Sequence, residues 1–139
     1  ANYIEGRIGM VIDGTGKEYD KIRQQKADLE ALGYDTHMIF VNTSIEVALE
    51  RNAARERTVP EDVAINSWKA VQGNIGKFSS LFRGTMIIVD NNKKDDDIEK
   101  MTFKEVKRLL GKKVRNTRAK QWIEMEMKRR GITRAPKGF

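Results

Sequence analysis

An acidic residue, Asp13, ends the short apolar run Ile8–Asp13 and is followed by Gly14-Thr15-Gly16. A continuous apolar run closed by glycine is typical of a strand buried on both faces. Ligands of open α/β sheets bind outside the carboxyl ends of the strands, which is where we expect Asp13. A carboxylate there can hold Mg²⁺ or accept the proton of a hydroxyl that attacks a phosphoryl group. The alternative is an ordinary strand-to-helix turn in which Asp13 is a cap.

A second group of chemically able side chains is an arginine-rich stretch that ends at Val59-Pro60. Arg51 and Arg55 are four residues apart, so they share a helix face, and Arg57 lies just beyond it. Guanidinium groups make bidentate contacts with phosphate and stabilise the charge of a transferred phosphoryl group. The alternative is a surface network in which these arginines pair with nearby glutamates, which are Glu46, Glu50 and Glu56.

Two amide side chains, Asn91 and Asn92, follow another apolar run, Thr85–Val89, and its closing Asp90. This position is again the ligand edge of a parallel sheet, where an asparagine can read a nucleotide base through paired hydrogen bonds. The alternative is a turn, because Asn and Asp are common turn residues.

The last third of the chain is strongly basic. Residues 1–90 carry 11 Lys/Arg against 13 Asp/Glu, whereas residues 91–139 carry 16 against 7. Such asymmetry predicts a face that meets an acidic partner, and nucleic acid is the common one. The candidate contacts are Lys112, Lys113, Arg115, Arg118, Lys128, Arg129 and Arg130. The alternative is a solvated basic helix that contributes only to solubility.

The elements that must position these groups alternate between strands and helices. We expect strands over residues 8–13, 36–41 and 85–89, and helices over 17–32, from 45, from 61 to 81, 102–110 and 116–130. Gly33 should end the first long helix, and Asn42-Thr43-Ser44 should cap the next. This alternation predicts βαβ units, a parallel sheet and the α/β class.

The composition excludes several kinds of site and several classes of protein. The chain has 139 residues, no cysteine and a single histidine, His37, so disulfides, thiolate metal sites and multi-histidine metal sites are excluded. No apolar run is long enough to span a bilayer, and no signal peptide opens the chain. We therefore expect no membrane partner and a cytoplasmic protein.

Taken in order, these segments resemble a known family. A strand ending DGTG, a strand ending FVNTS, the stretch from Glu46 to Pro60 and a strand ending IIVDNN are similar to phage-encoded zeta-toxin-like kinases. These lie close to polynucleotide kinases within the P-loop superfamily. The resemblance covers about Gly6 to Asn92, and its most specific part is Arg51-Asn52 with Arg55 and Val59-Pro60.

The resemblance implies a role for each candidate residue. Arg51, Arg55 and Arg57 would form a lid that closes over the phosphates of ATP. Asp13 would lie at the substrate hydroxyl and Mg²⁺, and Asn91 and Asn92 would lie near the base. The implied architecture is an incomplete P-loop kinase-type three-layer fold, with a core over residues 1–92 and a basic helical extension over 93–139.

The chain departs from that family in one respect. The phosphate-binding motif GxxxxGK[ST] (Walker A) is absent, because Gly9 and Gly14 have its spacing but Thr15 stands at the lysine position. Three expected strands are also few for such a sheet. We therefore expect the Walker A segment to precede residue 1 or to come from a complementary chain, and no kinase activity from these residues alone.

Two functions from different classes follow. The first is an ATP-dependent phosphotransferase whose acceptor is a hydroxyl on a nucleic-acid end or a nucleotide-like metabolite. The second is a non-enzymatic structural or nucleic-acid-binding component of a larger assembly, such as a viral particle. If the protein is phage-encoded, its expected location is the host cytoplasm or the virion.

Overall fold

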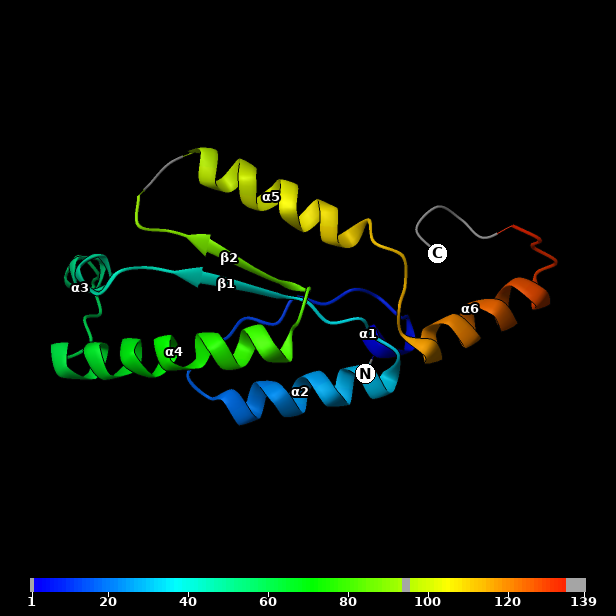
Figure 1. The fold of residues 1–139 in the computed structure, drawn as a ribbon, viewed down its shortest axis with the longest axis horizontal. Helices are drawn as coiled ribbons and strands as arrows, with labels where there is room; N and C mark the ends of the chain where they lie inside the picture. Colours follow the sequence, from blue (N-terminus) through cyan, green and yellow to red (C-terminus); the bar gives the residue numbers. More distant parts are fainter. Residues whose placement is uncertain (1, 94–95, 135–139) are drawn as a thin grey trace.

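The computed structural model describes residues 2–93 and 96–134, and it has a mixed α/β architecture (Figure 1). The elements in chain order are α1 (Asn2–Glu5), α2 (Tyr19–Leu32), β1 (Met38–Asn42), α3 (Ile45–Ala53), α4 (Glu61–Leu81), β2 (Met86–Asp90), α5 (Asp96–Leu110) and α6 (Thr117–Arg129).

The two strands form a parallel pair, and the crossover between them contains α3 and α4. Their register runs from Met38 opposite Met86 to Asn42 opposite Asp90. The backbone N–H of Asn91 donates to the carbonyl oxygen of Asn42 at 2.8 Å and extends the ladder by one bond. Both strands therefore end at the same edge, as the α/β prediction requires.

The core lies between the sheet and the helices α2 and α4. Phe40 of β1, Phe78 of α4 and Phe82 are buried, and Phe78 is 0 % exposed. Tyr19 and Ile22 bring α2 onto the same cluster, and the Tyr19 and Phe78 rings lie 5.6 Å apart. Burial of each such aromatic ring contributes about 2–3 kcal/mol. On the other side of the sheet α5 lies along β2, as Figure 1 shows.

Local signals place most element ends where the sequence predicts them. Gly33 follows α2 with a φ of 107°, and the N–H of Tyr34 donates to the carbonyl of Leu29 at 3.0 Å. A residue with a side chain would be strained in that left-handed conformation. The hydroxyl of Ser44 accepts from the N–H of Val47 at 3.3 Å and caps α3. Both predictions are confirmed.

The predicted strand over residues 8–13 is wrong. This segment has no regular secondary structure, it pairs with neither β1 nor β2, and the side chain of Val11 is 100 % exposed. Its apolar composition suits a strand with neighbours on both sides, but the segment does not pair with the open edge of either described strand. The described sheet therefore has two strands where three were predicted.

The longer stretch from Ile8 to Lys17 is nevertheless held at both ends by hydrogen bonds. The hydroxyl of Tyr34 donates to the carbonyl oxygen of Ile8 at 3.2 Å. The side-chain amide of the buried Asn74 donates to the carbonyls of Gly16 and Lys17 at 3.0 and 2.9 Å. The chain from Ile8 to Lys17 is thus an anchored extended connection rather than a strand.

The division of the chain at residue 92 stays a prediction. Beyond it, α5 contacts β2 and buries Leu109, which is 5 % exposed. The charged run Lys93–Asp97, whose composition predicts a solvated turn, falls partly on residues 94–95, which lie outside the described residues, and α5 begins at Asp96.

Candidate functional site

The carboxyl ends of β1 and β2 carry a cluster of polar side chains that we name the carboxyl-edge cluster, consisting of Asn42, Thr43, Ser44, Asp90 and Asn92. Both strand arrows point to the end of the molecule where α3 and the start of α4 lie (Figure 1). Since ligands of parallel sheets bind at this edge, the carboxyl-edge cluster is a candidate binding site.

Asn92 joins the ends of the two strands. Its side-chain oxygen accepts the backbone N–H of Ser44 at 2.6 Å, and its amide nitrogen donates to the carboxylate of Asp90, also at 2.6 Å. A side chain with both ends engaged must break these bonds before it can read a base. The side chain of Asn91 makes no hydrogen bond to any described residue, so its amide is the one free to bind a ligand.

Two residues of α4 complete this edge, and the sequence did not single them out for it. The amide of Gln72 donates to the side-chain oxygen of Asn42 at 2.7 Å, and the indole N–H of Trp68 donates to the carbonyl of Thr43 at 2.9 Å. The available signal was that a half-buried tryptophan needs an acceptor for its N–H. These bonds fix the β1–α3 junction against α4.

The arginine loop, residues 54–60, connects α3 to α4 at the same end of the molecule. Asn52, at the end of α3, closes this loop by pairing with the backbone of Val59. Its amide nitrogen donates to the carbonyl of Val59 at 2.7 Å, and its oxygen accepts the N–H of Val59 at 3.1 Å. Within the predicted motif Asn52 is therefore the residue that shapes the loop.

The three arginines of the motif carry unpaired charge. Arg51 is half-buried on α3, whereas Arg55 and Arg57 are exposed on the loop. None of the three is in an ion pair with any residue that the structure describes, so the surface network with nearby glutamates does not form there. Glu46 instead lies at the start of α3, where hydrogen bonds from its own backbone N–H and from Ser44 lower its pKa.

Among the residues described, Asp13 bonds to neither the carboxyl-edge cluster nor the arginines of the motif. It is exposed, and it makes no hydrogen bond or ion pair with the residues described. Across residues 2–93 and 96–134 no group of three or more acidic or histidine side chains could hold a metal ion. Mg²⁺ can also be held by one carboxylate together with waters and substrate phosphates, so the role of Asp13 at the metal stays a prediction.

A groove of about 360 Å³ runs between β2 and α5 and reaches the carboxyl edge. Ile88 and Met101 form apolar walls, and Asp90, Asn92 and Lys93 form the polar end. Ile88 and Met101 are 52 % and 67 % exposed, so this apolar surface is open to solvent. A ligand at the carboxyl edge would find an apolar wall directly beside it.

The basic residues predicted to contact nucleic acid differ in whether their side chains already have a partner. Arg129 and Arg130 both pair with Glu126, at 2.9 and 3.0 Å, and the hydrogen bonds from Arg129 and then Arg130 lower the pKa of Glu126. Arg118 donates to the carbonyl of Ala31 at 2.8 Å. The side chains of the remaining predicted contacts pair with no carboxylate in the part of the chain that is described: Lys112, Lys113, Arg115 and Lys128.

No helix in the described ranges is long and apolar enough to cross a membrane. Neither the curated proteins nor the solved structures contain a match to this chain. One protein-family model, described as Zeta toxin, matches residues 1–102. This match contains β1, the arginine loop and β2, the segments on which the sequence resemblance rests. The chain therefore belongs to the Zeta toxin family of P-loop kinases, whose members use ATP.

Proposed function

We propose that this chain is the lid and acceptor side of an ATP-dependent phosphotransferase. The acceptor is a hydroxyl on a nucleic-acid end or on a nucleotide-like metabolite. The observation that supports this proposal most directly is the arginine loop, which holds unpaired guanidinium groups at the end of the molecule where both strands terminate.

Each element of the arginine loop suits phosphate chemistry. Asn52 fixes the loop at Val59, so Arg55 and Arg57 project from a backbone with restricted freedom. Arg51 adds a third cation from the last turn of α3. A loop backbone that is already held in place lowers the entropy cost of ordering the guanidinium groups on a phosphate.

ATP, when bound, would supply the phosphoryl group that the acceptor hydroxyl receives. In this proposal Arg51, Arg55 and Arg57 neutralise the phosphate oxygens, and Asp13 accepts the proton of the hydroxyl. The free amide of Asn91 is the side chain that binds the base. Because the chain lacks GxxxxGK[ST], the backbone cradle for the phosphates must come from a complementary segment or chain.

The test uses the full-length gene product and measures phosphoryl transfer from ATP. Arg55→Ala should lower turnover by about 10³-fold, the range typical of arginines that contact a transferred phosphoryl group. The matched control is Arg23→Ala, because Arg23 is also exposed but lies on α2, where its side chain pairs with Asp20. Equal rates for wild type and Arg55→Ala would remove the arginine loop from the mechanism.

A second candidate function is binding of nucleic acid through the basic C-terminal region. Lys112, Lys113 and Arg115 support it, since their charges are not neutralised by any described carboxylate. Arg129 and Arg130 support it less, because Glu126 already pairs with both. In such a role the protein would be a component of a nucleoprotein assembly.

Fluorescence anisotropy with a labelled single-stranded oligonucleotide tests this second function. The logarithm of the association constant should fall linearly with the logarithm of salt concentration, by about 0.7 per phosphate neutralised. Lys128→Ala should reduce the slope by roughly one phosphate contact. An affinity independent of salt would contradict electrostatic binding.

A further inference from the structure

A second cavity lies at the opposite edge of the sheet from the carboxyl-edge cluster. It has a volume of about 410 Å³ and is lined by the residues just before each strand, such as His37 before β1 and Thr85 before β2. The end of α2, the end of α4 and the connection from α5 to α6 surround it. We name it the basic cavity.

Cations outnumber acids around the basic cavity. Its acidic side chains are Glu30 and Asp35. Its cationic side chains are Lys26, Arg83, Lys112, Lys113 and Arg115. With five positive and two negative groups, and His37 neutral, the lining carries a net charge of +3.

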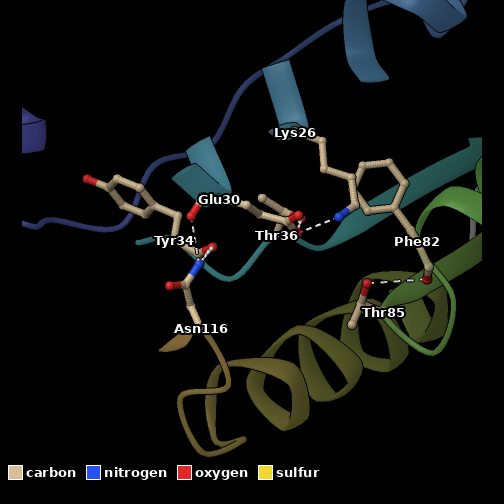
Figure 2. A network of polar contacts seen from close by, with 7 residues as sticks. All are labelled: Lys26, Glu30, Tyr34, Thr36, Phe82, Thr85 and Asn116. Carbon is tan, nitrogen blue, oxygen red and sulfur yellow. Dashed lines mark hydrogen bonds and ion pairs between the residues drawn. The ribbon is translucent and has the colours of Figure 1, made fainter. Parts of the chain in front are cut away.

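Both acids of the cavity are already engaged. Glu30 pairs with Lys26 and accepts the hydroxyl of Thr36 at 2.7 Å, and Figure 2 shows these contacts. Asp35 accepts the backbone N–H of Arg115 at 2.7 Å. The side chains of Arg83, Lys112, Lys113 and Arg115 therefore have no carboxylate partner among the residues described.

The backbone that carries Lys112, Lys113 and Arg115 is tied to the rest of the fold. The side chain of Asn116 donates to the carbonyls of Glu30 at 2.8 Å and Tyr34 at 3.2 Å, so it ties the α5–α6 connection to the end of α2 (Figure 2). The ammonium of Lys112 approaches the carbonyl of Gly84 at 3.4 Å. Thr117, the first residue of α6, also lines the cavity. A helix start adds a partial positive charge there.

We propose that the basic cavity binds a phosphate group, carried either by a phosphorylated small molecule or by the terminal phosphate of a nucleic acid. Several cations that line one cavity and have no carboxylate partner among the described residues are suited to a multiply charged anion. The cavity is large enough for more than a single phosphate, because its volume is about 410 Å³. This site is distinct from the arginine loop, and it requires neither phosphotransfer nor an extended nucleic-acid surface.

His37, the only histidine of the chain, reports on the cavity. Desolvation lowers its pKa first; Asp35 acts in the opposite direction, and Lys112 and Arg115 lower it further. The other charged groups that line the same cavity are Lys26, Glu30, Arg83 and Lys113. A bound anion would offset these cations, so it should raise the pKa of His37.

The experiment is an NMR titration of the His37 Cε1–H signal with pyrophosphate at constant ionic strength. Parallel titrations use an oligonucleotide with a 5′-phosphate and the same oligonucleotide without it. We expect a saturable shift and a higher His37 pKa with pyrophosphate, with the 5′-phosphorylated oligonucleotide, or with both. The pattern identifies whether the phosphate comes from a small molecule or from nucleic acid.

The double substitution Lys113→Ala with Arg115→Ala should weaken that binding by at least about tenfold. Both side chains are exposed, so the fold should survive, which the remaining spectrum checks. Lys104→Ala on α5 is the matched control, since Lys104 is exposed and lies outside the cavity. The proposal is overturned if no phosphate produces a saturable shift, or if the double variant binds as tightly as wild type.

Discussion

Asn52 is the residue whose substitution most directly tests the shape of the arginine loop. Asn52→Ala removes both hydrogen bonds to Val59 while leaving Arg51, Arg55 and Arg57 in place. We expect a loss of about 1 kcal/mol in the free energy of unfolding, and faster hydrogen exchange at the Val59 amide. The control is Asn66→Ala on α4, because Asn66 is exposed and makes no hydrogen bond to a described residue. Unchanged exchange at Val59 would show that Asn52 does not hold the loop.

Glu30 makes the stability of the fold depend on pH. Burial acts to raise its pKa, but hydrogen bonds from Lys26 and Thr36 and the charge of Lys26 leave it lowered. A carboxyl whose pKa is lowered by folding stabilises the folded state. This stabilisation is fully present at pH values above the pKa of the carboxyl in the unfolded chain, about 4.3. That contribution to stability is lost as the pH falls through the pKa that Glu30 has in the folded state.

The measurement is the urea midpoint between about pH 6 and pH 3, where acid groups titrate. Glu30→Gln should lower the midpoint at pH 6 and flatten its fall below pH 5. Glu99→Gln, an exposed control on α5, should leave the profile unchanged. A profile for Glu30→Gln that is parallel to wild type would assign the pH dependence to other groups.

Among the elements, the segment Ile8–Asp13 shows that a local sequence pattern is not sufficient for a strand, because a strand also needs a partner strand. Val11 is fully exposed, so Val11→Ala should change the free energy of unfolding by less than about 0.5 kcal/mol. Val71, which packs on the phenylalanine core, is the comparison, and Val71→Ala should cost about 1.5 kcal/mol. Equal losses for the two variants would mean that Ile8–Asp13 is a buried strand after all.

The elements that the sequence predicted correctly are those with local signals. Gly33 ends α2 because of its backbone conformation, and Ser44 starts α3 because its hydroxyl is three residues from a free N–H. The strand over 8–13 had the right composition, but pairing is a non-local event that composition does not determine. The helix and strand periods indicated the other long elements, although α5 begins at Asp96 and not at the predicted residue 102.

The candidate site was predictable in its residue types and less so in its contacts. The charge of the arginines follows from their side chains, whereas their lack of acidic partners depends on where the chain places Glu46 and its neighbours. The bond from Ser44 to Asn92 spans 48 residues, and no spacing rule indicates it. Sequence likewise did not indicate the basic cavity, because its cations come from α2, from the turn after α4 and from the α5–α6 connection.

At the scale of the whole molecule, the two proposed phosphate sites lie at opposite edges of the sheet. The arginine loop follows the carboxyl ends of the strands, and the basic cavity precedes their amino ends. A single ligand that fills one site leaves the other open. The two proposals can therefore fail independently, and one spectrum can observe both sites.

An NMR titration of the full-length gene product with ATP·Mg²⁺, observed at the arginine Nε–H signals, tests whether the arginine loop binds the nucleotide phosphates. We expect saturable shifts at Arg51, Arg55 and Arg57, which Asn52→Ala weakens and Arg23→Ala does not. Signals of these three arginines that stay fixed, while others such as Arg83 and Arg115 move, would contradict the claim that the arginine loop binds the nucleotide phosphates.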